Sequence, residues 1–463
     1  MMMEMVDDLW GRRRTSSRSI AVMLFLLVLL LLLLHCSSSS SPSQVLPPLI
    51  IQQLPRSSSS NSTGAAVVVS VDDFGAKGDG CTDDTKAFKD AWEFACLSPL
   101  RSILQIPAEN VYLVSPIKFA GPCKAKLTLL VSGTIIAPSD PDIWQGLDPQ
   151  KWLYFHGVRQ LVLGGGGTIN GMGQEWWARS CKRNATNPCR HAPTAVTFHR
   201  SKHLTVHDLT LMNSQQMHMA FNTCSHVRAS RLRVVAPAES PNTDGIHISA
   251  SVSVVVEDSI IRTGDDCISI VSNSSDILVK NIVCGPGHGI SIGSLGKSMT
   301  YARVDNILVD GCLITNTENG VRIKTWQGGS GCARKIIFQN ILMKNVSNPI
   351  IIDQYYCDSS HPCKNQTSAV KVDEISFIDI KGSSATEHAI KFACSDTFPC
   401  AKIFLKDIHL SLESGGNATS YCWKASGFAS DSVYPPSCLS RSDQHANHVI
   451  NPCVTSSTRK LDS

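Results

Sequence analysis

The sequence predicts a single-domain, all-β protein built as a parallel β-helix with a capping helix at its N-terminal end. An apolar segment interrupted by one small or polar residue recurs eight times, and a second short strand follows most copies. Helical periodicity is found in one segment near the N-terminus. With 43% hydrophobic and 17% charged residues among 463, the composition suits long buried strands better than exposed, charge-laced helices.

The N-terminal region is expected to precede the folded domain. Several arginines are followed by an apolar run over 20–34, which suits a signal peptide over 1–36 and is short of the roughly 20 residues that span a bilayer. An uncleaved anchor is the alternative, because no clear A-x-A cleavage site follows. Residues 37–66 are rich in Ser, Pro and Gln and are expected to be a flexible leader. We expect the domain over 67–454 and a polar tail over 455–463.

The cysteine content indicates an oxidising compartment. None of the 18 cysteines shows the CxxC spacing of a zinc site, and three close pairs suit short disulfide loops: Cys181/Cys189, Cys357/Cys363 and Cys394/Cys400. If Cys36 leaves with the signal peptide, an odd number remains and at least one thiol is free or pairs between chains. The net charge of +4 is too small for nucleic acid to be an expected partner.

Sequons for N-glycosylation fit the same secreted, extracellular location. The six acceptors are Asn61, Asn184, Asn273, Asn345, Asn365 and Asn417. Each sequon alone is a weak signal, and six that follow a signal-like start favour secretion.

A helix is expected from about Asp84 to Cys96, where Thr82 and Asp83 can cap its N-terminus. Its apolar residues recur at helical spacing: Ala87, Phe88, Ala91, Trp92 and Ala95. This face would cover the open end of the first coil and protect a sheet edge.

The interrupted strands form an internal repeat. Their central residues, called anchors here, lie 22 to 39 residues apart and are Asp208, Ser230, Asp258, Asn281, Gly311, Asn340, Asp379 and Asp407. Short strands repeated at this period without helices between them describe coils of a parallel β-helix, which bury their inward side chains by stacking. A leucine-rich repeat would need an L-x-x-L-x-L-x-x-N pattern, and a β-sandwich would not keep one register over eight units.

The second strands of four coils align in register. Their inward positions form two apolar columns, Ile246/Ile268/Ile290/Val321 and Ile248/Ile270/Ile292/Ile323. Two residues before the first column stand Asp244, Asp266, His288 and Asn319, and Asp265 is next to Asp266. Because neighbouring strands lie roughly 4.8 Å apart, these polar residues should form a ladder on one face.

Strict alternation would point this ladder into the core, where unpaired carboxylates are costly. The next residue is glycine in three of the four coils, at Gly245, Gly289 and Gly320. We therefore expect the chain to bend there and to carry the acids to an exposed outer position. Buried side chains at Asp244 and Asp266 would contradict this interpretation.

Further polar residues at outward positions extend the ladder into a cleft: His247, Ser269, Ser291, Arg322 and Lys324. Hydrolysis of a glycosidic bond needs a protonated acid and a base that activates water. Crowding three carboxylates raises the pKa of at least one of them. The two cations would bind a substrate that carries carboxylates, such as a uronic acid polymer. Alone, an Asp-Asp pair is more often a calcium ligand or a solvated turn, so the hypothesis rests on the joint placement.

The motifs of this cleft resemble those of the plant polygalacturonases, in the pectin-degrading glycoside hydrolase family. They are NTDG (242–245), GDDC (264–267), GHG (287–289) and RIK (322–324), and the resemblance covers roughly 67–454. It implies a right-handed β-helix that hydrolyses the α-1,4-galacturonosyl linkages of pectin or polygalacturonate with inversion. We expect a cell-wall monomer that needs no cofactor or metal and has no stable membrane partner.

The resemblance also implies a role for each site residue. Asp265 would be the general acid, Asp244 and Asp266 together would activate water, and His288 would tune the proton of the acid. Substrate binding would fall to Asn242, Arg322, Lys324 and Tyr356, with Tyr355 as a neighbouring alternative to Tyr356. A disulfide between Cys267 and Cys284 would lie beneath the site.

Three other functions stay open. A rhamnogalacturonan or other pectin-chain hydrolase could use the same scaffold, although GHG and RIK together argue against it. A pectate lyase would need calcium ligands and a basic residue that abstracts a proton. A non-catalytic cell-wall carbohydrate-binding homologue would keep the fold without hydrolysis. Endo or exo action depends on loops that the repeat does not specify.

Overall fold

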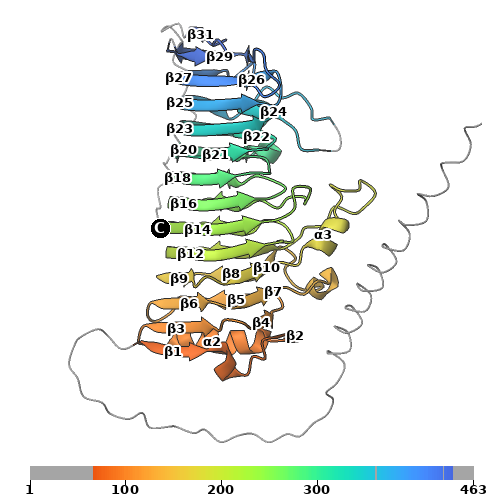
Figure 1. The fold of residues 1–463 in the computed structure, drawn as a ribbon, viewed down its shortest axis with the longest axis vertical. Helices are drawn as coiled ribbons and strands as arrows, with labels where there is room; N and C mark the ends of the chain where they lie inside the picture. Colours follow the sequence, from red (N-terminus) through yellow and green to blue (C-terminus); the bar gives the residue numbers. More distant parts are fainter. Residues whose placement is uncertain (1–65, 360–361, 431, 442–463) are drawn as a thin grey trace, which may run out of the picture. The chain divides into compact units, whose positions relative to one another are not determined.

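A computed structural model describes residues 66–359, 362–430 and 432–441. The expected signal peptide, almost all of the leader, the polar tail and the sequon at Asn61 lie outside these residues. The described strands of successive coils pair in parallel and stack into one long column (Figure 1). The predicted right-handed parallel β-helix is confirmed.

Two sheets make up the column. The 11-stranded sheet contains β5 (Ile117–Ala120), β8 (Lys151–His156), β11 (Thr194–His199), β13 (Met219–Asn222), β15 (Ile246–Ser249), β17 (Ile268–Ile270), β19 (Ile290–Leu295), β22 (Asn319–Trp326), β24 (Asn348–Tyr356), β26 (His388–Ala393) and β28 (Thr419–Trp423). This sheet carries the candidate site.

The 20-stranded sheet covers the other sides of the coil and includes the long strands. Its members are β1 (Val67–Ser70), β2 (Asp79–Asp83), β3 (Ser102–Ile106), β4 (Val111–Leu113), β6 (Leu127–Val131), β7 (Thr134–Ile136), β9 (Leu161–Gly164), β10 (Thr168–Asn170), β12 (Lys202–Met212), β14 (Ser225–Val235), β16 (Val252–Arg262), β18 (Ser274–Cys284), β20 (Tyr301–Asp310), β21 (Leu313–Thr315), β23 (Ser330–Val346), β25 (Lys371–Ser384), β27 (Cys400–Leu412), β29 (Ala425–Ala429), β30 (Val433–Tyr434) and β31 (Ser440–Arg441).

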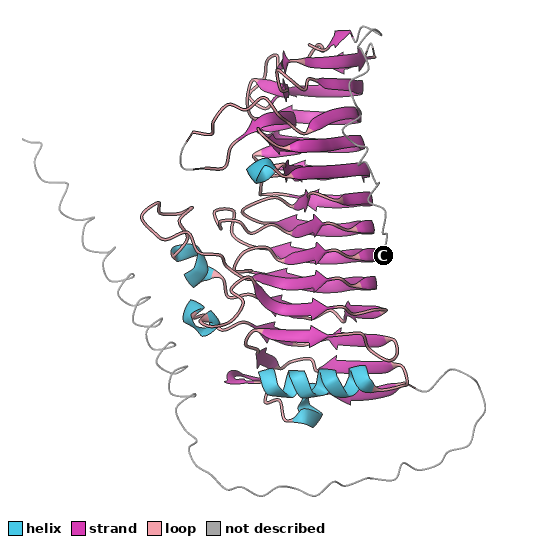
Figure 2. Cartoon of the chain, turned by 180° about the vertical axis from the view of Figure 1, so that it is seen from behind, coloured by secondary structure: helices cyan, strands magenta, loops and turns pink. Residues whose placement is uncertain are grey.

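The predicted helix is present as α2 (Thr85–Leu97), and it packs over the first coils at the N-terminal end (Figure 2). All five residues of its predicted apolar face are buried. The Trp92 ring lies 5.0 Å from that of Phe119. Asp83 accepts the Thr85 amide at 2.9 Å as expected, whereas the Thr82 hydroxyl bonds to Asp79 instead.

The other helical segments of the described residues are short. They are η1 (Val71–Phe74), η2 (Pro141–Trp144), α3 (Gln174–Ala178) and η3 (Lys297–Met299). No helix in the described part of the chain has both the length and the apolar character to cross a membrane.

The anchors of the repeat are backbone corners. Seven of the eight predicted anchors have a positive φ, for example Asp208 at 51° and Asn281 at 53°. In the second repeat the corner is Arg231 rather than Ser230. Asn and Asp tolerate this left-handed conformation, so a polar residue recurs where each long strand bends toward a new side of the coil.

Disulfides close several loops. The three predicted short pairs are all formed, and so is Cys267–Cys284. Cys96–Cys123 and Cys422–Cys438 were not predicted, because their spacing follows the stacking of coils rather than a short loop. Cys224 and Cys312 are free and buried.

The sequons differ in accessibility. Asn184, Asn273, Asn365 and Asn417 are exposed. Asn345 is half-buried, and its side-chain amide donates to Asn316 at 2.9 Å. Glycosylation stays a prediction, and Asn345 is its least accessible site among the described sequons.

Candidate active site

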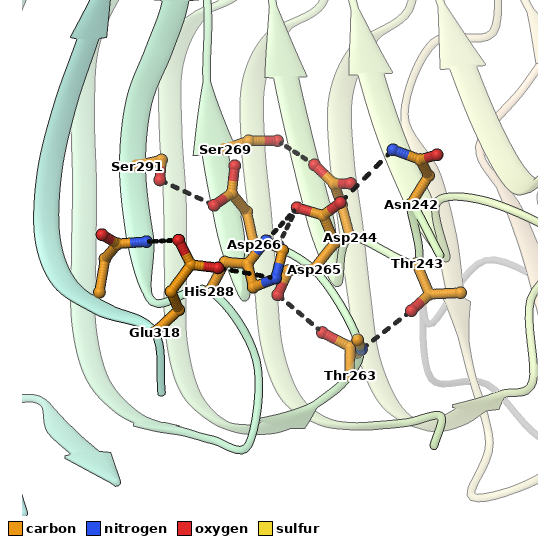
Figure 3. Close-up of polar contacts among 12 residues, drawn as sticks. Asn242, Thr243, Asp244, Thr263, Asp265, Asp266, Ser269, His288, Ser291 and Glu318 are labelled. Atoms are coloured by element: carbon orange, nitrogen blue, oxygen red, sulfur yellow. Dashed lines mark hydrogen bonds and ion pairs between the residues drawn. The ribbon is translucent and has the colours of Figure 1, made fainter. Parts of the chain in front are cut away.

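The site is built on the predicted register. Ile246 pairs with Ile268, Ile268 with Ile290, and Ile290 with Val321, so the first apolar column is confirmed. All four side chains are fully buried. The polar residues that precede these strands therefore lie on adjacent coils, where Figure 3 shows them gathered around Asp265 and Asp266.

The expected exposure of the acids is wrong for two of the three. Asp244 is 8% exposed and Asp266 is 2% exposed, whereas the Asp265 side chain is 18% exposed. Asp244 and Asp266 nevertheless lie outside the apolar core, because each accepts a 2.8 Å hydrogen bond from an outward serine, Ser269 and Ser291 respectively. Polar neighbours on the outer face, rather than the core, cover them.

The role expected for the glycines is also only partly right. Gly289 has a φ of 83°, as a bend requires, but Gly245 and Gly320 are not in the left-handed region. A Cβ at Gly245 would lie 2.4 Å from Ile261 and 2.5 Å from the Cys267 carbonyl oxygen. Glycine is needed there because the coils approach closely.

Asp266 is held by two cations. Arg322 Nη2 lies 2.8 Å from Oδ1 of Asp266, and Lys324 Nζ lies 2.8 Å from Oδ2. Arg322 Nε also donates to Ser291 at 3.0 Å. The two cations predicted for substrate binding are thus the counterions of a catalytic candidate.

Burial and charge set the protonation of the buried pair. Burial raises the pKa of Asp244 well above its ordinary 3.8, and the charges of Asp265 and Asp266 add to this effect. Burial also works to raise the pKa of Asp266, but Lys324 and Arg322 outweigh it and hold that pKa below 3.8. Asp244 therefore retains a proton where Asp266 is ionised.

Asp265 has different partners. His288 Nδ1 lies 3.0 Å from its Oδ1, and Asn242 Nδ2 donates to its Oδ2 at 3.4 Å. His288 Nε2 also lies 3.4 Å from Glu318, so the imidazole bridges two carboxylates. Burial works to lower the pKa of His288, but Asp265 and then Glu318 outweigh it and raise that pKa above 6.5.

These residues open into a cleft of about 290 Å³. Of the predicted site residues, it is lined by Asn242, Asp265, His288, Arg322, Lys324 and Tyr356. Asp244 and Asp266 lie behind its wall. Tyr356 is the tyrosine at the cleft, and Lys324 Nζ is 5.3 Å from its ring centroid. Tyr355 instead donates to Asp396 at 2.9 Å.

Three charged residues of the cleft were missed by sequence reasoning. Lys182, Glu318 and Asp358 also line it. Glu318 directly precedes Asn319 of the polar column, so the alignment of second strands could have found it. Lys182 and Asp358 come from loops outside the repeat and form an ion pair with each other.

Asp265, Asp266 and His288 could offer ligand atoms to a metal ion, since these atoms lie within 4.8 Å of one another. Both oxygens of Asp266, however, are already bonded to cations. The two positive side chains beside Asp266 would repel a metal cation bound to this carboxylate. The donor set therefore fits acid–base chemistry better than metal binding.

Comparisons with known proteins agree with this geometry. Residues 96–431 match the family model described as glycosyl hydrolases family 28. A probable polygalacturonase of Arabidopsis thaliana is 57% identical over 390 residues, which cover 84% of this chain and 88% of that protein. A polygalacturonase of Persea americana is 53% identical over 354 residues, 76% of each chain.

The fold has solved counterparts. A polygalacturonase from Erwinia carotovora ssp. carotovora superposes with a TM-score of 0.65 at 22% identity, over 81% of this chain and 99% of that one. This similarity supports the β-helix, and the family model and the plant relatives support the family. The chain therefore belongs to the glycosyl hydrolases of family 28 and is a glycoside hydrolase.

Proposed function

We propose that this glycoside hydrolase cleaves the α-1,4-galacturonosyl linkages of polygalacturonate with inversion of the anomeric configuration. The observation that carries the proposal is Asp265, a half-buried carboxyl that faces a cation-lined cleft with a second, buried pair of carboxyls behind it. The plant relatives described as polygalacturonases support this choice of substrate.

Asp265 is the general acid in this proposal. It is the one of the three aspartates that lines the cleft, so it can reach a leaving glycosidic oxygen. His288 is within hydrogen-bond distance at 3.0 Å, and its imidazolium would stabilise the Asp265 carboxylate once the proton has left. Asn242 orients the other oxygen of the same carboxyl.

Asp244 and Asp266 activate the attacking water together. The raised pKa of Asp244 keeps it protonated at rest, so the ionised Asp266 is the member of the pair that can accept a proton from water. Arg322 and Lys324 keep Asp266 ionised beside it. One proton shared within this pair allows water activation without placing three full charges together.

The cleft also suits an anionic sugar. The Arg322 guanidinium has five N–H donors, and Ser291 and Asp266 engage only Nε and Nη2. The remaining donors, with Tyr356 nearby in the cleft, would bind a galacturonate carboxylate. A neutral polysaccharide would offer no carboxylate to these donors.

The test uses polygalacturonate and the purified protein. We expect reducing ends to appear without ultraviolet absorption, which excludes a lyase, and proton NMR to show the β-anomer first. Asp265→Asn should lower kcat by at least about 10²-fold, the lower range for a lost general acid. If cleavage of rhamnogalacturonan were faster than that of polygalacturonate, the substrate assignment would be wrong.

We also propose that the protein is secreted to the cell wall and acts as a monomer. The disulfides support the extracellular location, because such bonds persist in extracellular proteins. Expression in plant tissue followed by assay of the wall fraction tests the location, and sedimentation of the purified protein tests the oligomeric state.

A further inference from the structure

Each buried aspartate of the site is hydrogen-bonded by a serine from the next coil. Ser269 donates to Oδ2 of Asp244, and Ser291 donates to Oδ1 of Asp266, both at 2.8 Å (Figure 3). The two serines are themselves buried, and they pair with each other in register between β17 and β19. A hydroxyl group has one proton, so a serine that donates to its aspartate can only accept from a further partner.

The further partner of the serine differs between the two coils. Nδ1 of His247 lies 2.8 Å from the Ser269 hydroxyl, and the two residues pair between β15 and β17. Nε of Arg322 donates to Ser291 at 3.0 Å, and these two residues pair between β22 and β19. Each aspartate thus ends a short chain of hydrogen bonds. One chain begins at an imidazole and the other at a guanidinium.

The imidazole of His247 is neutral and acts as a donor. Burial lowers the pKa of this half-buried ring to about 4; the charge of Asp266 opposes this effect and that of Lys324 adds to it. Because the Ser269 hydroxyl directs its proton to Asp244, the single ring proton of His247 has to be on Nδ1. His247 therefore holds Ser269 in the orientation that binds Asp244.

The charge at the start of each chain matches the state of the aspartate at its end. Arg322 is permanently charged, and its Nη2 also contacts the ionised Asp266. A neutral imidazole supports Asp244 without adding a positive charge, and burial keeps this carboxyl protonated. Since Oδ2 of Asp244 accepts from Ser269, Oδ1 is left to hold the proton.

We propose that His247 is a positioning residue for the reaction: as a neutral donor it orients the Ser269 hydroxyl, which fixes the Asp244 carboxyl that shares a proton with Asp266. The inference rests on the proposed function, because it concerns the pair that activates water. His247 is not among the residues that line the cleft, so its effect should appear in kcat rather than in KM. The position should accept a neutral donor, but neither an apolar residue nor a cation.

The experiment measures kcat and KM on polygalacturonate for three variants of His247. His247→Leu removes the donor, so kcat should fall about tenfold with KM nearly unchanged, as for the loss of one oriented hydrogen bond. His247→Gln keeps an N–H group for Ser269 and should retain kcat within about threefold of the wild type. His247→Lys is also a donor, but its charge favours ionised Asp244, so kcat should fall at least as far as in His247→Leu.

A second set of variants tests whether the effect passes through Ser269. Ser269→Ala should lower kcat by at least about tenfold, because it removes the bond to Asp244 itself. His247→Leu/Ser269→Ala should fall no further than Ser269→Ala, since both changes break the same chain. Independent losses of packing would instead add. If His247→Leu does not fold, His247→Gln and His247→Lys decide, and equal kcat in these two would overturn the inference.

His388 provides a matched control. Its Nδ1 lies 2.8 Å from the hydroxyl of Thr419 on the neighbouring coil, but this hydroxyl donates to the backbone oxygen of Glu387 rather than to a carboxylate. His388→Leu should therefore leave kcat unchanged. Equal losses of kcat in His247→Leu and His247→Gln would overturn the inference, as would a further fall in the double variant or a rise in KM in place of a fall in kcat. Cleavage of polygalacturonate by the wild type decides the proposed function separately.

Discussion

Lys324 and Asp266 form a buried ion pair, with Nζ 2.8 Å from Oδ2 and side chains that are 8% and 2% exposed. Arg322 binds the other oxygen of the same carboxylate. Lys324 is on β22, and Asp266 lies just before β17 on another coil. The ion pair therefore links two coils and also sets the charge of Asp266. The site and the stability of these coils therefore depend on the same contact.

Lys324→Met is expected to destabilise the protein. Removing one partner leaves a buried carboxylate with less compensation, which costs about 3 kcal/mol at the lower end of the usual range because Arg322 remains. Urea unfolding of the variant and the wild type measures the loss. Lys381→Met, which breaks an exposed pair with Asp379, is the control and should leave the midpoint unchanged. An equal, small shift for both would show that the buried pair does not stabilise the fold.

Asp244→Asn and Asp266→Asn are expected to change the pH dependence of stability in opposite directions. The folded-state pKa of Asp244 is raised, so its stabilising contribution is present below pH 3.8 and is lost as the pH rises through the raised pKa. The Asn variant should thus be more stable than the wild type above that pKa. Asp266 has a lowered pKa, so its contribution is present above pH 3.8 and is lost as the pH falls.

The measurement for this pair is urea unfolding at neutral pH and again well below pH 3.8. Asp266→Asn should be less stable than the wild type at neutral pH. In acid, the difference in free energy of unfolding between each variant and the wild type should become smaller. Both variants should lose activity. A stabilising effect of Asp266→Asn at neutral pH would contradict the assignment of its ionised state.

Glu318→Gln is expected to shift the pH profile of activity. Asp265 and Glu318 both raise the pKa of His288, so removing the Glu318 charge should lower that pKa. If protonated His288 supports the acid, the basic limb of kcat/KM moves to lower pH while the maximum rate changes little. Glu374→Gln, at an exposed pair with Lys402, is the control and should leave the profile in place.

The two disulfides of similar loop length should separate stability from activity. Cys267–Cys284 and Cys422–Cys438 span 17 and 16 residues, so converting either pair to serine should cost about 3 kcal/mol by the loop-entropy model. Only Cys267 follows Asp266 directly. Removal of the Cys267–Cys284 disulfide should therefore also lower kcat. Removal of Cys422–Cys438 should leave kcat of the folded enzyme unchanged. Equal kcat in both variants would mean that the first disulfide does not position the site.

Regular features of this fold could be predicted from the sequence because they have a period. The alternation around Ile246 and Ile268 gave the inward columns, and the spacing of Phe88 and Trp92 gave the buried face of α2. The corner at Arg231 was placed one residue early, at Ser230, since both residues are polar and only the backbone conformation distinguishes them.

Side-chain contacts between residues far apart in the sequence could not be predicted from periodicity. Arg322 and Lys324 were predicted beside the acids, but not as counterions of Asp266, which lies 56 and 58 residues away. Their engagement explains why Asp266 can be ionised although it is buried. The burial of Asp244 likewise depends on how Ser269 and its neighbours pack across coils, which alternation alone does not specify.

The positions of the loops at the cleft could not be predicted from the repeat either. These loops lead to a last prediction. Lys182 and Asp358 are 176 residues apart in the chain and form an ion pair between two loops that project from the same side of the stack (Figures 1 and 2). Each follows a cysteine of a short disulfide loop, Cys181–Cys189 and Cys357–Cys363. Both residues line the cleft. We therefore expect the pair to restrict entry of a polymer from the side.

Lys182→Ala should therefore favour attack within long chains. The pair is exposed, so its loss should change the free energy of unfolding by less than about 1 kcal/mol. The fall in viscosity of polygalacturonate per reducing end released should become steeper, because chain interiors reach Asp265 more easily. Lys182→Arg keeps the pair and should behave as the wild type. If all three proteins give the same ratio of viscosity loss to reducing ends, the two loops do not control how the polymer enters.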